Sequence, residues 1–494
     1  MDDFRNGLAG VIGKGSISDD PAVLAGYSSD VSFVSGGNPL LVAYPENRGE
    51  VQQIVQLAYE NEIPLVPVSS GPPRFNGDTI PERDSVIIDF SKMKRIMNID
   101  TINRAAMIEA GVTYGELIPE LKKQGLKLIT PLLPRASKSV VTSRLEREPT
   151  LVPKYQFDYV DPLLTLEVVY GTGDDFRTGS ASGPGKLKDL QSDKVNPWGP
   201  GSVDYFRFLS GAQGTLGLVT WIVTKVEVFP KLRKLYFIPV KDTSKLTSPM
   251  NMLLRKRVVD ECLALNNADL ATILAENMSG DYTELKSSLP PWTVIVCISG
   301  YERRPEERVS IQEKYLLEIC KELDLKASTS LPGTGGSEEK MLELLSRVWD
   351  KTPYWKLRLK GSSRQIFFLS PFSKVAELIE TMNSVTAKYD YLVDEIGCYV
   401  QPMVQGRGCH IEFNLPCDES HTAEMATVKE LFTDASETLM KNGAYFSRPY
   451  GLWADMVYDG NAELVEAFRK LKGIYDPANI LNPGKLCFGE KEYG

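Results

Sequence analysis

The side chains best suited to acid–base chemistry are concentrated in one short segment near the end of the chain. Only two histidines, His410 and His421, occur among 494 residues, and His410 lies in GRGCHIEFNL, two residues before Glu412. Side chains two apart on a strand point to the same side, so His410 and Glu412 can share a ligand or a substrate. No second histidine is near in the sequence, which weakens a metal site completed by Cys409. We favour His410 as a catalytic base or substrate contact and expect no metal.

A second candidate is the sequence VPVSSGPPRFNG, residues 66–77, in which a β-rich run breaks into a tight loop. Pro72 and Pro73 carry no backbone N–H, so two donors that the loop could offer are missing. Arg74 follows directly and offers a positive charge and five N–H donors. The pattern indicates a loop against which a ligand lies; the alternative is that Arg74 faces solvent.

Composition excludes several classes of protein. The chain is 42% hydrophobic and 24% charged, with a formal net charge of −9, which is typical of a globular protein. The negative net charge does not favour binding to nucleic acid. Charged residues interrupt every apolar run before the ~18 residues that a membrane span needs. Seven scattered cysteines without a C-x-x-C pair, and the absence of a signal-like N-terminus, lead us to expect a cytoplasmic protein.

Periodicity predicts an α+β protein. Residues 40–43, 64–68 and 85–89 read as strands, and residues 46–61 as an amphipathic helix between the first two. A further strand ends at Ala110, a helix covers 113–124, and residues 163–178 read as a β-hairpin. Residues 179–203 read as a surface loop, and residues 217–229 form the longest β-rich run, which ends at Pro230.

Longer helices, over 307–323 and 373–389, follow between strands at 292–298 and 409–415, which predicts an α+β unit with an antiparallel sheet. A helix at 462–471 precedes an irregular tail that must be pinned to another element. We therefore predict three parts, with residues 1–230 and 231–440 as domains and residues 441–494 as a segment that returns to the first domain.

Six segments in sequence order resemble one family. The chain has no G-x-G-x-x-G turn and no Walker lysine loop. It has instead PENRGEVQQIVQLA, IPLVPVSSG, SVIIDFSKMKRI, IEAGVTYGEL, GAQGTLGLVT and YDPANILNPGK. Together these resemble the FAD-linked oxidases and dehydrogenases of the vanillyl-alcohol-oxidase and p-cresol-methylhydroxylase type, which include D-lactate and glycolate dehydrogenases. The resemblance implies a two-domain FAD-binding fold of p-cresol-methylhydroxylase type, in which residues 1–230 bind FAD and residues 231–440 form an α+β cap with an antiparallel sheet.

The resemblance also implies which residues contact FAD. The loop of residues 69–77 would wrap the pyrophosphate with backbone N–H groups, and Arg74 would replace the donors that the prolines remove; the remaining alternative is a loop that no longer binds FAD. The segment from Pro131 to Glu148 would run beside the flavin ring, with Val141 and Thr142 where the family has glycines. The cofactor-binding residues predicted in this way are Ser69, Ser70, Gly71, Pro72, Pro73, Arg74, Phe75, Asn76, Gly77, Pro134, Ser137, Val140, Val141, Ser143, Arg144, Gly214, Thr215, Gly217, Val219, Asn482 and Lys485.

The way FAD is held follows from residue types. Covalent attachment in the family uses histidine, cysteine or tyrosine, and no histidine or cysteine precedes Cys262, so attachments made from the FAD domain cannot form. We expect noncovalent FAD. An aspartate that the aromatic-alcohol branch places near the reactive flavin nitrogen is replaced by Pro134.

The resemblance implies two substrate classes. AYFSRPYGLW lies where the aromatic-alcohol branch binds a phenolate, so Tyr445 and Arg448 are candidate catalytic residues, with Tyr450 as a second tyrosine. The alternative is that Tyr445 packs in a core and Arg448 caps a helix. The segment around His410 resembles an eroded form of the metal-binding strand of the hydroxy-acid branch.

Arg407 and Arg358 are candidate contacts for the carboxylate of a hydroxy acid. The expected function is hydride transfer from a small hydroxylated substrate to flavin N5, with an aromatic alcohol or phenol slightly preferred over a D-2-hydroxy acid. A flavin-carrying electron-transfer subunit is the third alternative. The expected partners are a small-molecule substrate and an electron-acceptor protein or quinone, in a homo-oligomer or a larger complex, with no nucleic acid and no membrane span.

Overall fold

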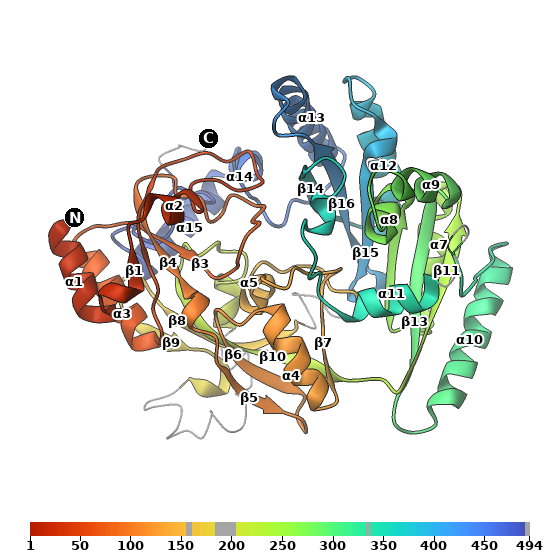
Figure 1. The fold of residues 1–494 in the computed structure, drawn as a ribbon, viewed down its shortest axis with the longest axis horizontal. Helices are drawn as coiled ribbons and strands as arrows, with labels where there is room; N and C mark the ends of the chain where they lie inside the picture. Colours follow the sequence, from red (N-terminus) through yellow and green to blue (C-terminus); the bar gives the residue numbers. More distant parts are fainter. Residues whose placement is uncertain (155–160, 183–203, 332–333, 335–336, 490–494) are drawn as a thin grey trace.

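The part of the chain that the structure describes forms three β-sheets with helices packed on them (Figure 1). The computed structural model describes residues 1–154, 161–182, 204–331, 334 and 337–489. Two sheets come from residues 17–228 and the third from residues 232–417, which is the α+β architecture that the sequence predicts. Most of the loop predicted at 179–203 lies outside the described residues.

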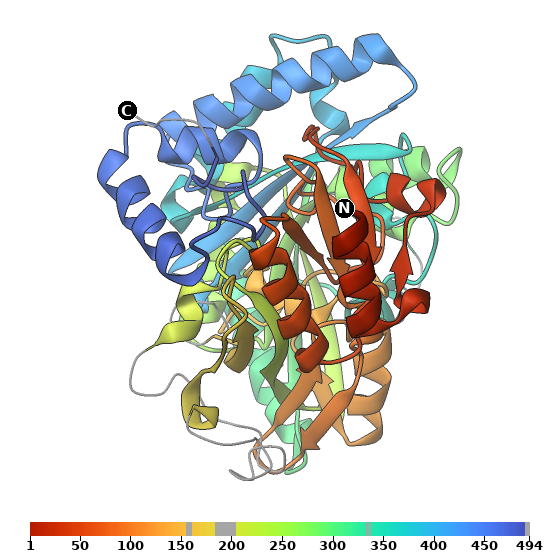
Figure 2. The same ribbon diagram turned by 90° about the vertical axis from the view of Figure 1, so that its left-hand side faces the viewer.

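The first sheet has the order β1-β2-β4-β3, in which β2, β4 and β3 are parallel. The helix α3 begins after Asn47, whose side chain accepts from the amide of Glu50, and it carries the chain from β2 to β3. Figure 2 shows α1 and α3 side by side over this sheet. The elements are α1 (Asp2–Ile12), β1 (Ile17–Ser18), α2 (Pro21–Ala25), β2 (Pro39–Ala43), α3 (Arg48–Glu60), β3 (Leu65–Val68) and β4 (Ser85–Asp89).

The second sheet is antiparallel, with the order β5-β6-β10-β8-β9 and β7 paired to β10. Its long central strand is the β-rich run that ends before Pro230, and β8 and β9 form the predicted hairpin. A capping box between Thr113 and Glu116 starts α4. The elements are β5 (Ile96–Asp100), β6 (Ala105–Glu109), α4 (Tyr114–Lys123), β7 (Leu126–Leu128), α5 (Val140–Leu145), β8 (Leu163–Val169), β9 (Asp175–Arg177) and β10 (Leu218–Val228).

The third sheet, called the cap sheet below, is antiparallel with the order β11-β13-β12-β15-β16-β14. One face packs on α7, α10, α12 and α13, and the other on α8, α9 and α11. Its strands are β11 (Leu232–Val240), β12 (Glu261–Asn266), β13 (Trp292–Gly300), β14 (Ser362–Ser370), β15 (Gly397–Met403) and β16 (Gly408–Cys417). Its helices are α7 (Thr247–Arg255), α8 (Asn267–Leu274), α9 (Asp281–Ser288), α10 (Pro305–Glu322), α11 (Ser337–Ser346), α12 (Val375–Thr386) and α13 (Thr422–Lys441).

The C-terminal segment returns to the first sheet, as the irregular tail predicts. The helices α14 (Leu452–Tyr458) and α15 (Ala462–Tyr475) precede the tail. In the tail, the carbonyl of Ile480 accepts from the amide of Leu65 at 2.7 Å. The side-chain amide of Asn482 donates to the carbonyls of Asp78 and Gln213 at 2.9 and 2.7 Å. The tail therefore joins the loop after β3 to the segment before β10, two of the regions that form the site.

Candidate active site

A cavity of about 190 Å³ lies where the first two sheets meet the cap sheet. Four regions form most of its lining: the loop after β3, the segment 131–149 around α5, the segment 209–219 that leads into β10, and the strands β14, β15 and β16 with residues 354–356. Arg448 and Tyr450 complete the wall from the C-terminal segment. The site thus combines residues from all three parts of the chain.

The loop of residues 69–77 presents some of its residues to the cavity and turns others away. Ser69, Ser70, Arg74, Phe75 and Asn76 line the cavity. The remaining residues pack on the protein: the amide of Gly71 donates to the carbonyl of Ser137 at 2.9 Å, Pro72 accepts from the Ser137 hydroxyl at 3.2 Å, and Gly77 donates to the Asp30 carboxylate at 2.7 Å. Gly71, Pro72, Pro73 and Gly77 therefore shape the loop without lining the cavity.

Arg74 is held at the cavity wall with donors to spare. Its side chain lies 4.9 Å from the centre of the Tyr27 ring, and one terminal nitrogen donates to the carbonyl of Gly26. Its Nε is buried without a partner among the described residues, as is the hydroxyl of Thr79. No described residue accepts from the backbone amides of Phe75 and Asn76. This set of unused donors around a cation fits a phosphate group.

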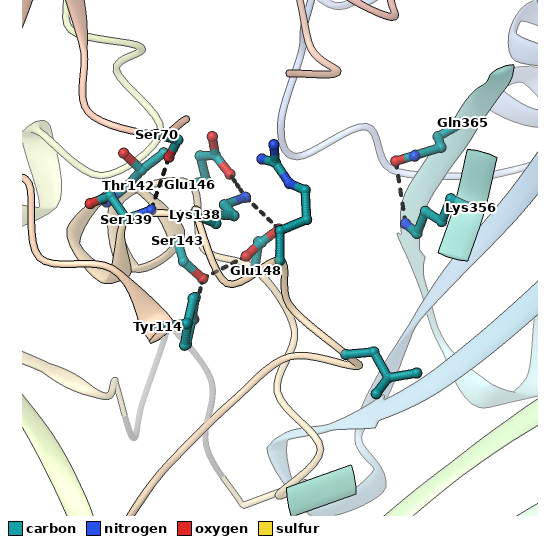
Figure 3. A network of polar contacts seen from close by, with 12 residues as sticks. Ser70, Tyr114, Lys138, Ser139, Thr142, Ser143, Glu146, Glu148, Lys356 and Gln365 are labelled. Atoms are coloured by element: carbon teal, nitrogen blue, oxygen red, sulfur yellow. Dashed lines mark hydrogen bonds and ion pairs between the residues drawn. The ribbon is translucent and has the colours of Figure 1, made fainter. Parts of the chain in front are cut away.

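A buried network of charges supports the wall formed by the segment 131–149, next to the loop after β3 (Figure 3). The Lys138 ammonium is 2.7 Å from both the Glu146 and the Glu148 carboxylates. The Ser143 hydroxyl donates to Glu148 at 2.5 Å and accepts from the Tyr114 hydroxyl at 2.7 Å. Burial alone would raise the pKa of Glu148, but the charge of Lys138 outweighs it and lowers the pKa to about 2. Lys138, Glu146 and Glu148 all line the cavity.

The other predicted cofactor contacts divide in the same way. Pro134, Val141, Gly214, Gly217 and Val219 line the cavity, whereas Ser137, Val140, Ser143, Arg144, Thr215 and Asn482 do not, and Lys485 lines a second cavity next to it.

Arg144 has a structural environment that the sequence did not reveal. Its guanidinium donates to the Thr224 hydroxyl at 3.1 Å and to the carbonyl of Ile129 at 2.5 Å, which ties α5 to the second sheet.

His410 and Glu412 face the cavity from one side of β16, as their spacing predicts. The imidazole is 1% exposed and neither ring nitrogen has a hydrogen-bond partner among the described residues. Burial lowers the pKa of His410 to about 4, so the ring is neutral at pH 7. The Lys356 ammonium lies 2.5 Å from Glu412, and its charge overcomes burial and holds the pKa of that carboxyl well below its usual range.

The C-terminal segment brings Arg448 and Tyr450, rather than Tyr445, to the cavity. Arg448 is 8% exposed, lies 4.1 Å from the centre of the Phe367 ring, and has no carboxylate of the described residues within ion-pair distance. Tyr450 is buried. Tyr445 pairs through its backbone with Leu369 and its side chain is 64% exposed. Arg448 therefore lines the cavity together with Tyr450, and the predicted pair of Tyr445 and Arg448 does not meet there.

The two candidate contacts for a substrate carboxylate lie outside the cavity. Arg358 donates to the carbonyls of Thr272, Ala275 and Glu276 at 2.5, 2.9 and 3.2 Å, at the C-terminal end of α8. Arg407 is exposed. The thiol of Cys409 is directed to the carbonyl of Ser370, and no cluster of metal-ligating side chains occurs among the described residues.

Several cavity residues were not predicted as individual contacts. Lys138 and Glu146 flank α5 within the segment expected to run beside the flavin, whereas Lys356, Gln365, Phe367 and Tyr399 come from a short 3-10 helix and from β14 and β15. The alternation of side chains along β14 and β15 predicts which residues share a face of each strand. The pairing register with β16, which places Phe367 and Tyr399 beside Glu412, is not visible in that alternation.

The residues present fit FAD. Unused donors of Arg74, Thr79 and the amides of Phe75 and Asn76 lie on the wall formed by the loop after β3, as a diphosphate requires. The cap sheet lines another wall, where a planar ring and a substrate have polar and aromatic neighbours. No helix among the described residues is long and apolar enough to cross a membrane.

Comparison with known proteins gives the same result. Residues 39–140 match the FAD binding domain family, and residues 369–486 match the C-terminal domain of FAD linked oxidases. The chain is 25% identical to the glycolate oxidase subunit GlcD of Bacillus subtilis over 98% of this chain and 96% of that protein. It is 22% identical to the flavoprotein subunit of 4-cresol dehydrogenase (hydroxylating) of Pseudomonas putida, over 88% of this chain and 85% of that protein.

The fold is that of a solved flavoprotein. The crystal structure of p-cresol methylhydroxylase with substrate bound superimposes with a TM-score of 0.83 at 17% identity, covering 100% of this chain and 98% of the other. The two matched families cover both the loop after β3 and the strand that carries His410. The chain therefore carries an FAD binding domain and the C-terminal domain of FAD linked oxidases on the fold of p-cresol methylhydroxylase, and it is an FAD-dependent oxidoreductase.

Proposed function

We propose that the protein oxidises a phenol or an aromatic alcohol, with FAD bound between residues 1–230 and a cap of residues 231–440. The observation that carries this proposal is the environment of Arg448, a buried guanidinium over the Phe367 ring with no carboxylate partner, in a wall that also contains Tyr450. A buried cation without an anion is costly, so a substrate oxygen that becomes negative is favoured there. The aromatic neighbours favour a substrate with a ring.

The chemistry divides between cofactor and chain. FAD, when bound, supplies the acceptor for the hydride that leaves the substrate carbon. Arg448 and Tyr450 hold the phenolic or alcoholic oxygen and lower its pKa through charge-assisted hydrogen bonds. The neutral imidazole of His410 accepts the proton that this oxygen releases, so the substrate loses one hydride and one proton. The Glu412–Lys356 pair beside the imidazole fixes the charge around it.

The binding of FAD is assigned to the walls of the cavity other than the cap sheet. We propose that Arg74 and the amides of Phe75 and Asn76 hold the diphosphate, and that Pro134, Val141, Gly214, Gly217 and Val219 form the walls around the remainder of the cofactor. FAD is held without a covalent bond, so denaturing the protein should release all of it into the supernatant.

A 2-hydroxy acid is the second candidate. Arg448 offers a positive charge for a carboxylate as well as for a phenolate, and His410 offers the base. The similarity to the glycolate oxidase subunit supports this alternative. We further propose that an electron-acceptor protein or a quinone reoxidises FAD. A protein acceptor is supported by the similarity to 4-cresol dehydrogenase, whose matching chain is named a flavoprotein subunit.

An anaerobic panel of substrates tests the proposed function. Purified protein with FAD is mixed without oxygen with 4-hydroxybenzyl alcohol, D-lactate and glycolate, and the visible absorbance of the flavin is followed. Loss of the absorbance with the phenolic alcohol supports the proposal. Loss with D-lactate or glycolate alone assigns the protein to the second candidate, and no loss with any of them supports an electron-transfer subunit.

Arg74→Ala is expected to weaken FAD binding by roughly 10-fold or more, because a charge-assisted hydrogen bond to a phosphate is lost. The measurement is titration of the apoprotein with FAD, followed by the change in flavin fluorescence. Arg48→Ala is the control, since Arg48 forms an exposed ion pair with Asp175 on the surface. An Arg74 variant that binds FAD as tightly as the control would contradict the assigned role.

His410→Gln is expected to lower kcat/KM by ~10²-fold, the usual contribution of a general base. Because burial depresses the pKa of His410 to about 4, the parent should keep its activity as the pH falls until about 4, where the imidazole becomes protonated. The variant should lack this acid limb. His421→Gln is the control, because His421 is exposed and outside the cavity. An unchanged pH profile in the His410 variant would assign the base elsewhere.

A further inference from the structure

A second cavity of about 850 Å³ opens beside the first. It lies between the outer edge of the cap sheet, the loop of residues 31–35 and α14. Six of the described residues line both cavities; Gln365, Phe367 and Tyr450 are near the proposed substrate oxygen, and Phe75 and Asn76 belong to the loop after β3. The second cavity therefore adjoins the first along a wall that includes the proposed substrate contacts.

The strand β14 is the last strand of the cap sheet, and its free edge faces this cavity. At Leu369 that edge is used, because Leu369 and Tyr445 exchange two backbone hydrogen bonds of 2.8 and 2.9 Å. Residues two apart on a strand direct their backbone groups to the same side, so Ser363, Gln365 and Phe367 also point away from β16. Outside the ladder of β14 with β16, no described residue forms a backbone–backbone hydrogen bond with these three residues.

Single polar atoms of side chains on the same stretch are also left without partners. The Ser363 hydroxyl, the Gln365 amide nitrogen and Nε of Arg364 are buried and have no hydrogen-bond partner among the described residues. Ser363 is 1% exposed and Arg364 5%. Buried polar groups in native proteins are nearly always paired, so a row of unpaired groups beside a cavity indicates a ligand that pairs with them.

We propose that the second cavity binds an extended amide-bearing chain attached to the aromatic head of the substrate. This proposal rests on the proposed function for the head group. The chain would lie along β14 as an added strand, accepting from and donating to the backbone of Ser363, Gln365 and Phe367. These three residues span about 13 Å of extended strand, so the chain would be a peptide or peptide-like chain of about four residues. The substrate class is then an aromatic alcohol or phenol that carries a short peptide-like substituent.

The test compares three compounds with the FAD-loaded protein. The first is 4-hydroxyphenylacetamide, which is the head alone. The second is a neutral, capped tetrapeptide of alternating threonine and valine, which is the chain alone. The third carries the 4-hydroxyphenylacetyl group on the N-terminus of the same tetrapeptide. Binding is measured by calorimetry, and hydrogen–deuterium exchange at residues 363–367 reports whether the free edge is covered.

The expected result is that the joined compound binds at least ~10-fold more tightly than the head alone, which corresponds to about two net hydrogen bonds. It should also slow the exchange of the amides of Ser363, Gln365 and Phe367. Equal affinity for the joined compound and the head, with no protection of these amides, would overturn the proposal and leave the proposed function intact. Protection by the tetrapeptide alone, with no binding of the head, would support the chain site and contradict the proposed function.

A matched pair of variants isolates the backbone contact. Ser363→Pro removes an N–H that points away from β16, which an edge strand tolerates, and Ser363→Ala removes the hydroxyl but keeps the N–H. In the proline variant, the affinity of the joined compound relative to the head alone should fall from ~10-fold to about threefold or less. The alanine variant should keep most of the ~10-fold ratio. Both variants should bind the head like the parent. If the proline variant does not fold, the exchange data on the parent decide; equal affinities in both variants would overturn the backbone contact.

Discussion

Arg448→Ala is expected to lower kcat/KM for a phenolic substrate by ~10²- to 10³-fold, the size of effect seen when a charge-stabilising donor is removed from a closed site. The guanidinium is buried over Phe367 and its charge is not neutralised by a carboxylate of the described residues. Its loss removes the group that stabilises the developing negative oxygen. The measurement is steady-state turnover, together with the affinity for a phenol that cannot be oxidised, as a function of pH.

Two further variants make this prediction specific. Arg448→Lys keeps the charge without the planar fork, so an intermediate loss is expected. Tyr445→Phe should leave turnover unchanged, because the Tyr445 side chain is 64% exposed and does not line the cavity. Tyr450→Phe, in contrast, should lower turnover. A large loss in Tyr445→Phe, with none in the Tyr450 variant, would restore the pairing predicted from sequence and contradict the geometry described here.

Lys138→Met is expected to destabilise the protein by about 3–5 kcal/mol, the usual cost of removing one member of a buried ion pair. Lys138 neutralises both Glu146 and Glu148, which are 2.7 Å from its ammonium. Without it, two buried carboxylates face each other across the cavity wall. The free energy of unfolding is measured by denaturant titration of the apoprotein, so that FAD binding does not contribute.

The free energy of unfolding is expected to change with pH in opposite directions in the parent and in Lys138→Met. In the parent, the pKa of Glu148 is lowered to about 2, so its ionised form stabilises the fold above about pH 4.5, and this stability is lost as the pH falls toward 2. In Lys138→Met, burial raises the carboxyl pKa instead, so stability should fall as the pH rises through 5 to 7. Lys123→Met is the control, because Lys123 pairs with Glu120 at the surface and should cost less than about 1 kcal/mol. Equal stabilities at pH 7 would show that the network contributes nothing.

Local periodicity predicted the elements of the first two sheets well. Residues 85–89 form β4 at the expected bounds, the helix expected at 113–124 is α4, and the hairpin expected at 163–178 is β8 and β9. These elements depend on local patterns, because alternation, a capping box and a turn are all encoded within a few residues. The order of six family motifs identified the fold, which a single motif would not have done.

The walls of the site depend on pairings between distant parts of the chain. Lys356 and Glu412 are 56 residues apart and meet because the segment before β14 lies over β16. Tyr445 and Tyr450 are both near Arg448 in the sequence, but Tyr445 extends the edge of β14 and so turns its ring to solvent. Sequence spacing alone could not choose between the two tyrosines, since the segment between them is irregular and has no period.

Flavin reduction with an isotopically labelled substrate tests the central claim most directly. FAD-loaded protein is mixed without oxygen with 4-hydroxybenzyl alcohol that carries hydrogen or deuterium on the benzylic carbon, and the flavin absorbance is followed in a rapid-mixing instrument. Cleavage of the benzylic bond predicts full bleaching, slower with deuterium than with hydrogen. A flavin that stays oxidised with both phenolic alcohols and is bleached by D-lactate or glycolate would contradict the assignment of the Arg448 wall to an aromatic substrate.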